Sequence, residues 1–221
     1  MKKTMLSAVC AALLGLGLAA SVPTAQAQLM SSAHAVVKAE QPTAPELHKA
    51  MRALWHGHVV TTRNYALAVH AGDKAAAAAA ADTVVDNAKQ ITAAVAGFYG
   101  QPAADGLLTL LAGHWGAVKA LTDNAQAGNQ AGVDQAMTDM GLNAGEIAKF
   151  LASANPNWKE ADLQAGLIAH GGHHKSQIDL MMSNAPKADQ DKEWLAMQDH
   201  MDAVADVLAD GIAKQFPDKA K

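Results

Sequence analysis

Cysteine is almost absent from this chain of 221 residues, which contains only Cys10. Cys10 lies in an apolar run, Met5 to Ala20, that follows two lysines and precedes Ala25-Gln26-Ala27, a small-x-small pattern typical of signal-peptidase cleavage. We therefore interpret residues 1–27 as an export signal that is cleaved near Ala27. The protein that remains has no cysteine, which excludes disulfides, thiolate metal ligands, iron–sulfur clusters and covalently attached haem.

Positive charge is also scarce. Without the two lysines of the export signal, the chain has 15 Lys and Arg against 21 Asp and Glu, a formal charge of minus 6. No basic stripe is present, which argues against nucleic acid as a partner. After the export signal, no run reaches the roughly 18 apolar residues of a membrane-spanning helix. We expect a periplasmic protein without a membrane span, and the sequence identifies no protein partner.

Sequence signatures of enzymes are absent as well. The chain has no G-x-S-x-G, no H-E-x-x-H, no glycine-rich phosphate loop and no nucleophile placed beside a base. Only 4% of the residues are aromatic. The sequence therefore favours a binding protein over an enzyme.

The chain does contain long amphipathic segments. Residues 28–42 are small, polar and aperiodic, which predicts a flexible leader, whereas residues 43–218 show apolar positions three and four residues apart. Thr43, Asp73 and Asn157 are expected to cap helices. Short connections favour antiparallel neighbours, so we predict an all-α domain over 43–218: an up-and-down bundle of about six helices in three αα-hairpins. The breaks fall at Gly72-Asp73, Gly100 to Pro102, Gly128-Asn129, Asn155-Pro156 and Asn184 to Pro186.

Polar residues recur on these apolar stripes at a fixed spacing. His58, His114 and His170 are 56 residues apart (114 − 58 = 170 − 114 = 56), and the same offset separates Asn87 from Asn143. This pattern is typical of duplicated hairpins, and alignment of the third copy places His200 at the asparagine position. Residues equally far from a hairpin turn lie at the same height, which predicts one polar layer. Its members are His58, Asn87, His114, Asn143, His170 and His200.

A layer of core imidazoles suggests a metal site. Neutral imidazole binds zinc, copper, nickel and iron, and several such side chains from separate helices can surround one ion. We predict a copper or zinc ion, with Asn87 and Asn143 as partners that orient the imidazoles. His48 lies off the repeat and is interpreted as a surface residue. The predicted metal ligands are His58, His114, His170 and His200, with His174 added because it lies one turn from His170 on the same helix face.

Three other interpretations remain open from the sequence. Haem could be held noncovalently between two imidazoles, although few aromatic residues are available to stack on a porphyrin. The histidines and asparagines could instead hydrogen-bond to one another and only fix the register of the helices. The hairpins could also serve as an interaction module. If the helices splay into an open array, about 10 Å between neighbouring axes would keep the imidazoles from sharing one ion.

Three segments carry a resemblance to a known family. They are Leu54 to Val59 (LWHGHV), Ala154 to Trp158 (ANPNW) and Gly211 to Lys219 (GIAKQFPDK). From about residue 45 onward the chain resembles a family of small exported bacterial all-helical proteins without established activity.

The resemblance has implications for function and for the site. Members of the family sometimes carry a glycosyltransferase label, but sugar-nucleotide transferases need a nucleotide-binding fold, and the only D-x-D of this chain, Asp189 to Asp191, opens a helix. The resemblance further implies that histidines at 58, 114, 170 and 200 belong to the family pattern. The pair His173-His174 is peculiar to this sequence.

Overall fold

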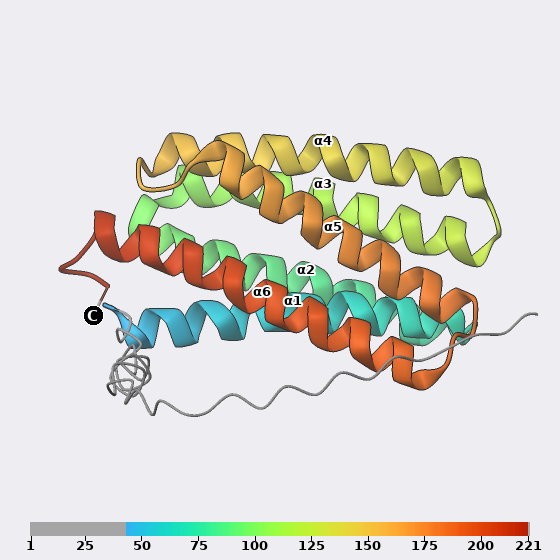
Figure 1. Cartoon of the computed structure of the whole chain (residues 1–221). Helices are drawn as coiled ribbons and strands as arrows, with labels where there is room; N and C mark the ends of the chain where they lie inside the picture. The colour runs from blue at the N-terminus through green and yellow to red at the C-terminus, as the bar shows by residue number, and fades with distance from the viewer. Residues whose placement is uncertain (1–42, 221) are drawn as a thin grey trace, which may run out of the picture. The chain divides into compact units, whose positions relative to one another are not determined.

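A computed structural model describes residues 43–220, which form six helices and no strand (Figure 1). The predicted all-α, up-and-down bundle is therefore confirmed. The export signal predicted at 1–27 and the leader predicted at 28–42 lie outside the described residues. The helices are α1 (Pro45–His70), α2 (Lys74–Tyr99), α3 (Gln101–Gln126), α4 (Gln130–Ala154), α5 (Glu160–Met182) and α6 (Lys187–Gln215).

The turns of the first two hairpins are built alike. Gly72 and Gly128 have φ values of +71° and +68°, a backbone conformation that glycine adopts without steric cost. The carboxylate of Asp73 accepts a hydrogen bond from the Ala76 amide at 2.9 Å, and the Asn129 side chain accepts one from the Gly132 amide at 3.2 Å. These contacts satisfy otherwise free amides at the starts of α2 and α4.

Two of the predicted caps are wrong. The residue that precedes α1 is Ala44 rather than Thr43, and no side chain caps this helix. Asn157 does not cap α5, which begins after Lys159. The backbone amide of Asn157 donates instead to the side-chain oxygen of Asn155 at 2.9 Å. Asn155 is fully buried and organises this turn.

The six helices close into a ring. Each helix packs on its neighbours in sequence, and α1 packs on α6, so the first and last helices meet. The odd-numbered helices α1, α3 and α5 also contact one another and so meet in the middle of the bundle. Because the helices form a closed ring rather than a splayed array, side chains from different hairpins can converge.

The middle of the bundle contains two separate apolar clusters. One includes Met51, Leu107 and Leu163, and the other includes Val118 and Ile178 farther along the same three helices. The stretch between the clusters is where α1, α3 and α5 carry their core histidines. Among the described residues, none of the helices is both long and apolar enough to span a membrane.

The contact between α1 and α6 is partly ionic. His48 is buried, with Nδ1 2.9 Å from a carboxylate oxygen of Asp206 and Nε2 3.1 Å from one of Asp210. Arg52 also forms a salt bridge with Asp206, which keeps the pKa of that carboxyl below its usual value. The interpretation of His48 as a surface residue is wrong, because it occupies the helix face that joins α6.

Candidate metal centre

Four histidines meet between the two apolar clusters. His58 comes from α1, His114 from α3, and His170 and His174 from α5. One nitrogen of each lies within 4.8 Å of one nitrogen of every other, and the four side chains are only 2 to 5% exposed. The structure therefore brings together four of the five predicted ligands, and they come from three different hairpins.

The rings form a compact group. The ring centroids of His58, His114 and His170 are 5.5 to 5.7 Å apart, so they make a nearly equilateral triangle. His174 lies beside this triangle, with its Nε2 3.1 Å from the Nε2 of His170. In a tetrahedral zinc site with Zn–N bonds of about 2.0 to 2.1 Å, ligand nitrogens are roughly 3.3 Å apart. One pair already meets this spacing, and every other pair lies within 4.8 Å.

Burial keeps these imidazoles neutral. It lowers the pKa of His58 to about 3, with the nearby His114 as a smaller cause, and it lowers the pKa of His114 to about 4. It also lowers the pKa of His170 and of His174 well below the usual value, and the neighbouring histidines add to both shifts. A neutral imidazole keeps one nitrogen lone pair free, which is what a metal ion requires.

Two nitrogens of the cluster have no hydrogen-bond partner within residues 43–220. They are Nε2 of His114 and Nδ1 of His170, and both are buried. A buried polar atom without a partner costs about 1 to 3 kcal/mol. Such atoms are uncommon in folded proteins and call for a specific reason, such as a bound ion or a functional role.

The even-numbered helices bond to the same place on each odd-numbered helix. Asn87 donates to the carbonyl oxygen of Leu54 and Asn143 to that of Leu110, each at 3.1 Å. His200 makes the corresponding contact with the carbonyl oxygen of Gly166, at 3.0 Å. In all three hairpins the carbonyl lies four residues before the core histidine. The two asparagines therefore hold the helix turn that precedes His58 and His114, and no hydrogen bond joins them to an imidazole in the described chain.

Glycines make room for these asparagines. A Cβ atom added to Gly57 would lie 2.8 Å from Nδ2 of Asn87, and one added to Gly113 would lie 3.1 Å from Nδ2 of Asn143. Both distances are shorter than an ordinary van der Waals contact. The absence of a side chain at these two positions thus allows α2 and α4 to approach the histidine-bearing helices.

His200 and His173 lie next to the four-histidine cluster and are not part of it. The ring of His200 is 6.3 Å from that of His170, is half-buried, and uses Nε2 for the contact with Gly166. His173 lies 5.1 Å from His200, and its Nδ1 is 2.7 Å from a carboxylate oxygen of Glu193. The described structure therefore groups His174, rather than His200, with His58, His114 and His170.

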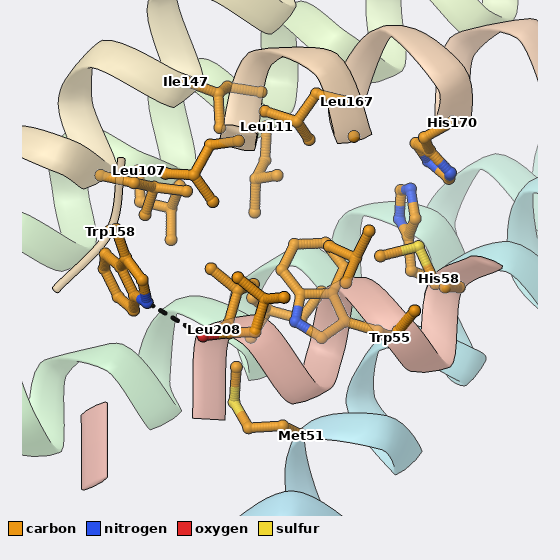
Figure 2. Close-up of a pocket in the computed structure, with 18 of the residues that line it drawn as sticks. Met51, Trp55, His58, Leu107, Leu111, Ile147, Trp158, Leu167, His170 and Leu208 are labelled. Atoms are coloured by element: carbon orange, nitrogen blue, oxygen red, sulfur yellow. Dashed lines mark hydrogen bonds between the residues drawn. The ribbon is translucent and has the colours of Figure 1, made fainter. Parts of the chain in front are cut away.

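An apolar cavity of about 240 Å³ adjoins the cluster. Figure 2 shows His58 and His170 at one end and Trp158 at the other. Trp158 packs on α6 at Gly211, and its Nε1 donates to the carbonyl oxygen of Val207 at 3.1 Å. The cavity walls carry aliphatic and aromatic side chains, including those of Met51, Leu107, Leu111, Ile147, Leu167 and Leu208.

Sequence reasoning missed the buried position of His48 and the cavity. The burial of His48 has a signal in the sequence, because it lies three residues before Met51 and seven before Trp55, on the same helix face. The cavity has no such signal, since its volume depends on how side chains from all six helices pack. Comparison of the chain with family models, with curated proteins and with solved structures finds no match.

Proposed function

We propose that this protein binds one transition-metal ion through His58, His114, His170 and His174. The observation that carries the proposal is the group of four buried imidazoles within 4.8 Å of one another, two of which have a buried nitrogen without a partner among residues 43–220. Burying polar nitrogens without partners is unfavourable, and an ion that accepts their lone pairs would offset that cost.

The ligand set favours monovalent copper over zinc. All four ligands are neutral, and no carboxylate belongs to the cluster, so the charge of the ion is not compensated by its ligands. The cost of burying an ion rises steeply with its charge, which penalises a divalent ion in apolar surroundings. Imidazole is a suitable ligand for both copper and zinc, so the lower charge of monovalent copper decides the order. Zinc is the second choice.

The packing of the rings also favours an ion over haem. Each of the four rings lies within 6.1 Å of the other three, measured between centroids. A porphyrin placed between any two of them would have to displace the others. A single ion needs only small changes in side-chain rotation.

The amino-terminal sequence supports an exported protein, and we propose the periplasm as its location. One ion for a chain of this size suits delivery or sensing better than bulk storage. The hydrogen-bonded asparagines and His200 would hold the three hairpins in register around the ion, so the structural role of this layer and ion binding are compatible.

The test is a measurement of metal content and affinity. We would incubate the mature protein anaerobically with Cu(I), and separately with Zn(II), remove free ions by gel filtration, and measure the bound metal by mass spectrometry. We expect one copper per chain, and a loss of most of it in His114→Ala. His56→Ala is the matched control, because His56 is an exposed histidine on α1 outside the cluster.

Three outcomes would contradict the proposal. In the first, the wild-type protein retains neither metal and the His114→Ala variant changes only in stability, which would mean that the histidines have a purely structural role. A Soret band in protein purified from the periplasm would indicate haem. Equal copper retention by His114→Ala and wild type would place the ion elsewhere.

A further inference from the structure

The cavity beside the histidine cluster has the dimensions of a ligand site. Its volume of about 240 Å³ exceeds the roughly 150 Å³ of an engineered apolar cavity that binds benzene. It extends along α6 from His200 to Ile212, a length of about 18 Å at 1.5 Å per residue. The space is therefore long enough for a linear chain of eight to ten carbon atoms, on the order of 10 to 12 Å, within that helical span.

Three side chains of the cavity lining carry unpaired polar nitrogens. Nε1 of Trp55, Nε2 of His114 and Nδ1 of His170 are buried without a hydrogen-bond partner in the described chain, and all three side chains line the cavity. In Figure 2 the indole of Trp55 lies among the cavity side chains between Trp158 and His58, with its nitrogen on the ring edge away from His58. Trp158, by contrast, has its indole nitrogen already bonded to Val207. The lining thus includes one N–H donor and two imidazole nitrogens, while the rest of the walls is largely apolar.

The cavity has its mouth between α5 and α6. Among its lining residues, Asp162, Ala203 and Val207 are exposed, whereas those on α1 and α3 are buried or nearly so. Gly166 is also part of the lining, and a Cβ atom added there would lie 3.8 Å from Val204 across the gap between the two helices. A larger side chain at 166 would therefore narrow the mouth without forcing a backbone clash.

We propose that this cavity binds a small neutral alcohol whose hydroxyl group lies at the Trp55 end and whose hydrocarbon body fills the apolar walls. A hydroxyl oxygen can accept from the indole N–H of Trp55, which otherwise has no partner in the described chain. A charged head group is disfavoured, because the imidazoles here are neutral and Asp162 at the mouth repels anions. This inference does not require a bound ion.

The test uses metal-free protein, treated with a chelator, and 1-octanol as the probe. We would titrate 1-octanol and octanoate by calorimetry at pH 7.5 and follow tryptophan fluorescence, since Trp55 and Trp158 are in the cavity wall. We expect saturable binding of one 1-octanol per chain, at least about 10-fold tighter than octanoate because a buried carboxylate lacks a charged partner.

Two variants locate the binding. Gly166→Leu should weaken 1-octanol binding by at least about 10-fold, a change of one unit in log Kd, by filling the mouth. Gly172→Leu is the matched control on the same helix, where an added Cβ meets open space outside the cavity, and it should bind as wild type does. Trp55→Phe keeps the aromatic ring and removes the donor, so binding should weaken by about 2- to 10-fold.

Non-saturable partitioning of 1-octanol, binding unchanged in Gly166→Leu, or octanoate binding as tight as 1-octanol would each overturn the inference. The copper measurement is independent of these results, because Gly166 supplies no imidazole to the cluster. The cavity proposal and the metal proposal can therefore fail separately.

Discussion

The third hairpin differs from the first two at the positions that matter for chemistry. Four residues after the core histidine, the first hairpin has Thr62 and the second has Val118. The third hairpin has His174 at this position in α5. The asparagine of α2 and α4 becomes His200 in α6, although each bonds to the corresponding backbone carbonyl. The comparison teaches that the first two hairpins each add one imidazole to a common frame. The third hairpin adds two imidazoles to the cluster, those of His170 and His174.

The mouth of the cavity lies in the third hairpin too. The residue whose carbonyl oxygen accepts the hydrogen bond from the even-numbered helix is Leu54 in α1 and Leu110 in α3. In α5 this residue is Gly166, and the cavity opens there. A small residue at this position keeps α5 from covering the gap beside α6. Both proposed binding functions therefore use residues particular to the third hairpin, His174 and Gly166, together with His58, His114 and Trp55 of the first two hairpins.

The largest expected effect concerns acid. In metal-free protein the folded pKa values of His58 and His114, about 3 and about 4, lie below the value of about 6.5 expected in the unfolded chain. The unfolded state therefore takes up protons first as pH falls. Stability is complete above about pH 6.5 and declines toward pH 4, by about 1.4 kcal/mol per pH unit for each histidine.

Urea unfolding at pH 7.5, 6.0 and 4.5 measures this decline. His58 and His114 together should remove roughly 5 kcal/mol between pH 6.5 and 4.5. Replacing His174 with Thr, the residue at this position in the first hairpin, should make the decline in stability with falling pH less steep. The difference corresponds to about one proton fewer taken up on unfolding. An equal slope in the variant would mean that the third hairpin contributes no additional neutral imidazole.

The next effect concerns the ion itself. His174→Thr should weaken copper binding on the order of 100-fold, about 2.7 kcal/mol, because loss of a direct ligand should cost at least as much as loss of a supporting contact. Competition against a Cu(I) chelator measures the affinity. The control is Thr62→Ala in the first hairpin, whose hydroxyl bonds only to backbone carbonyls of its own helix. Equal affinity of His174→Thr and wild type would remove the distinction between the hairpins.

The smallest effect concerns the frame shared by the first two hairpins. Gly57→Ala places a Cβ 2.8 Å from Asn87 and should lower the free energy of unfolding by about 1 to 3 kcal/mol. Gly113→Ala should cost less, because its Cβ would lie 3.1 Å from Asn143. Gly97→Ala is the control, since space is open there, and it should stabilise by about 0.5 to 1 kcal/mol. Equal urea midpoints for all three variants would contradict this account.

The sequence was sufficient to predict the helices, because their apolar positions follow the helical period and their turns contain glycine, asparagine and proline. The cap predicted at Asp73 follows from local chemistry, since its side chain reaches an amide three residues ahead. Asn129, in the equivalent turn, makes the same contact. The cap expected at Thr43 was wrong because Ala44 holds that place. Such choices depend on how the helix end packs, and a local pattern does not contain that information.

The convergence of His58, His114 and His170 follows from their equal spacing and from hairpins of equal length. The choice between His174 and His200 does not follow, because both lie near the predicted layer. It depends on the rotation of α5 and α6 about their axes, which side-chain packing sets. That the spacing reflects duplicated hairpins stays a prediction, supported by the recurring carbonyl contacts.

The cluster takes its members from three hairpins that are also joined by short turns, by apolar packing and, between α1 and α6, by the contacts of His48 and Arg52 with Asp206. A bound ion would tie α1, α3 and α5 to one point, so no hairpin could open without breaking a coordinate bond. Local fluctuations that the metal-free bundle undergoes one hairpin at a time would then become a single concerted event. Amide hydrogen exchange in α1, α3 and α5 would slow together on loading, as though the chain had gained a cross-link.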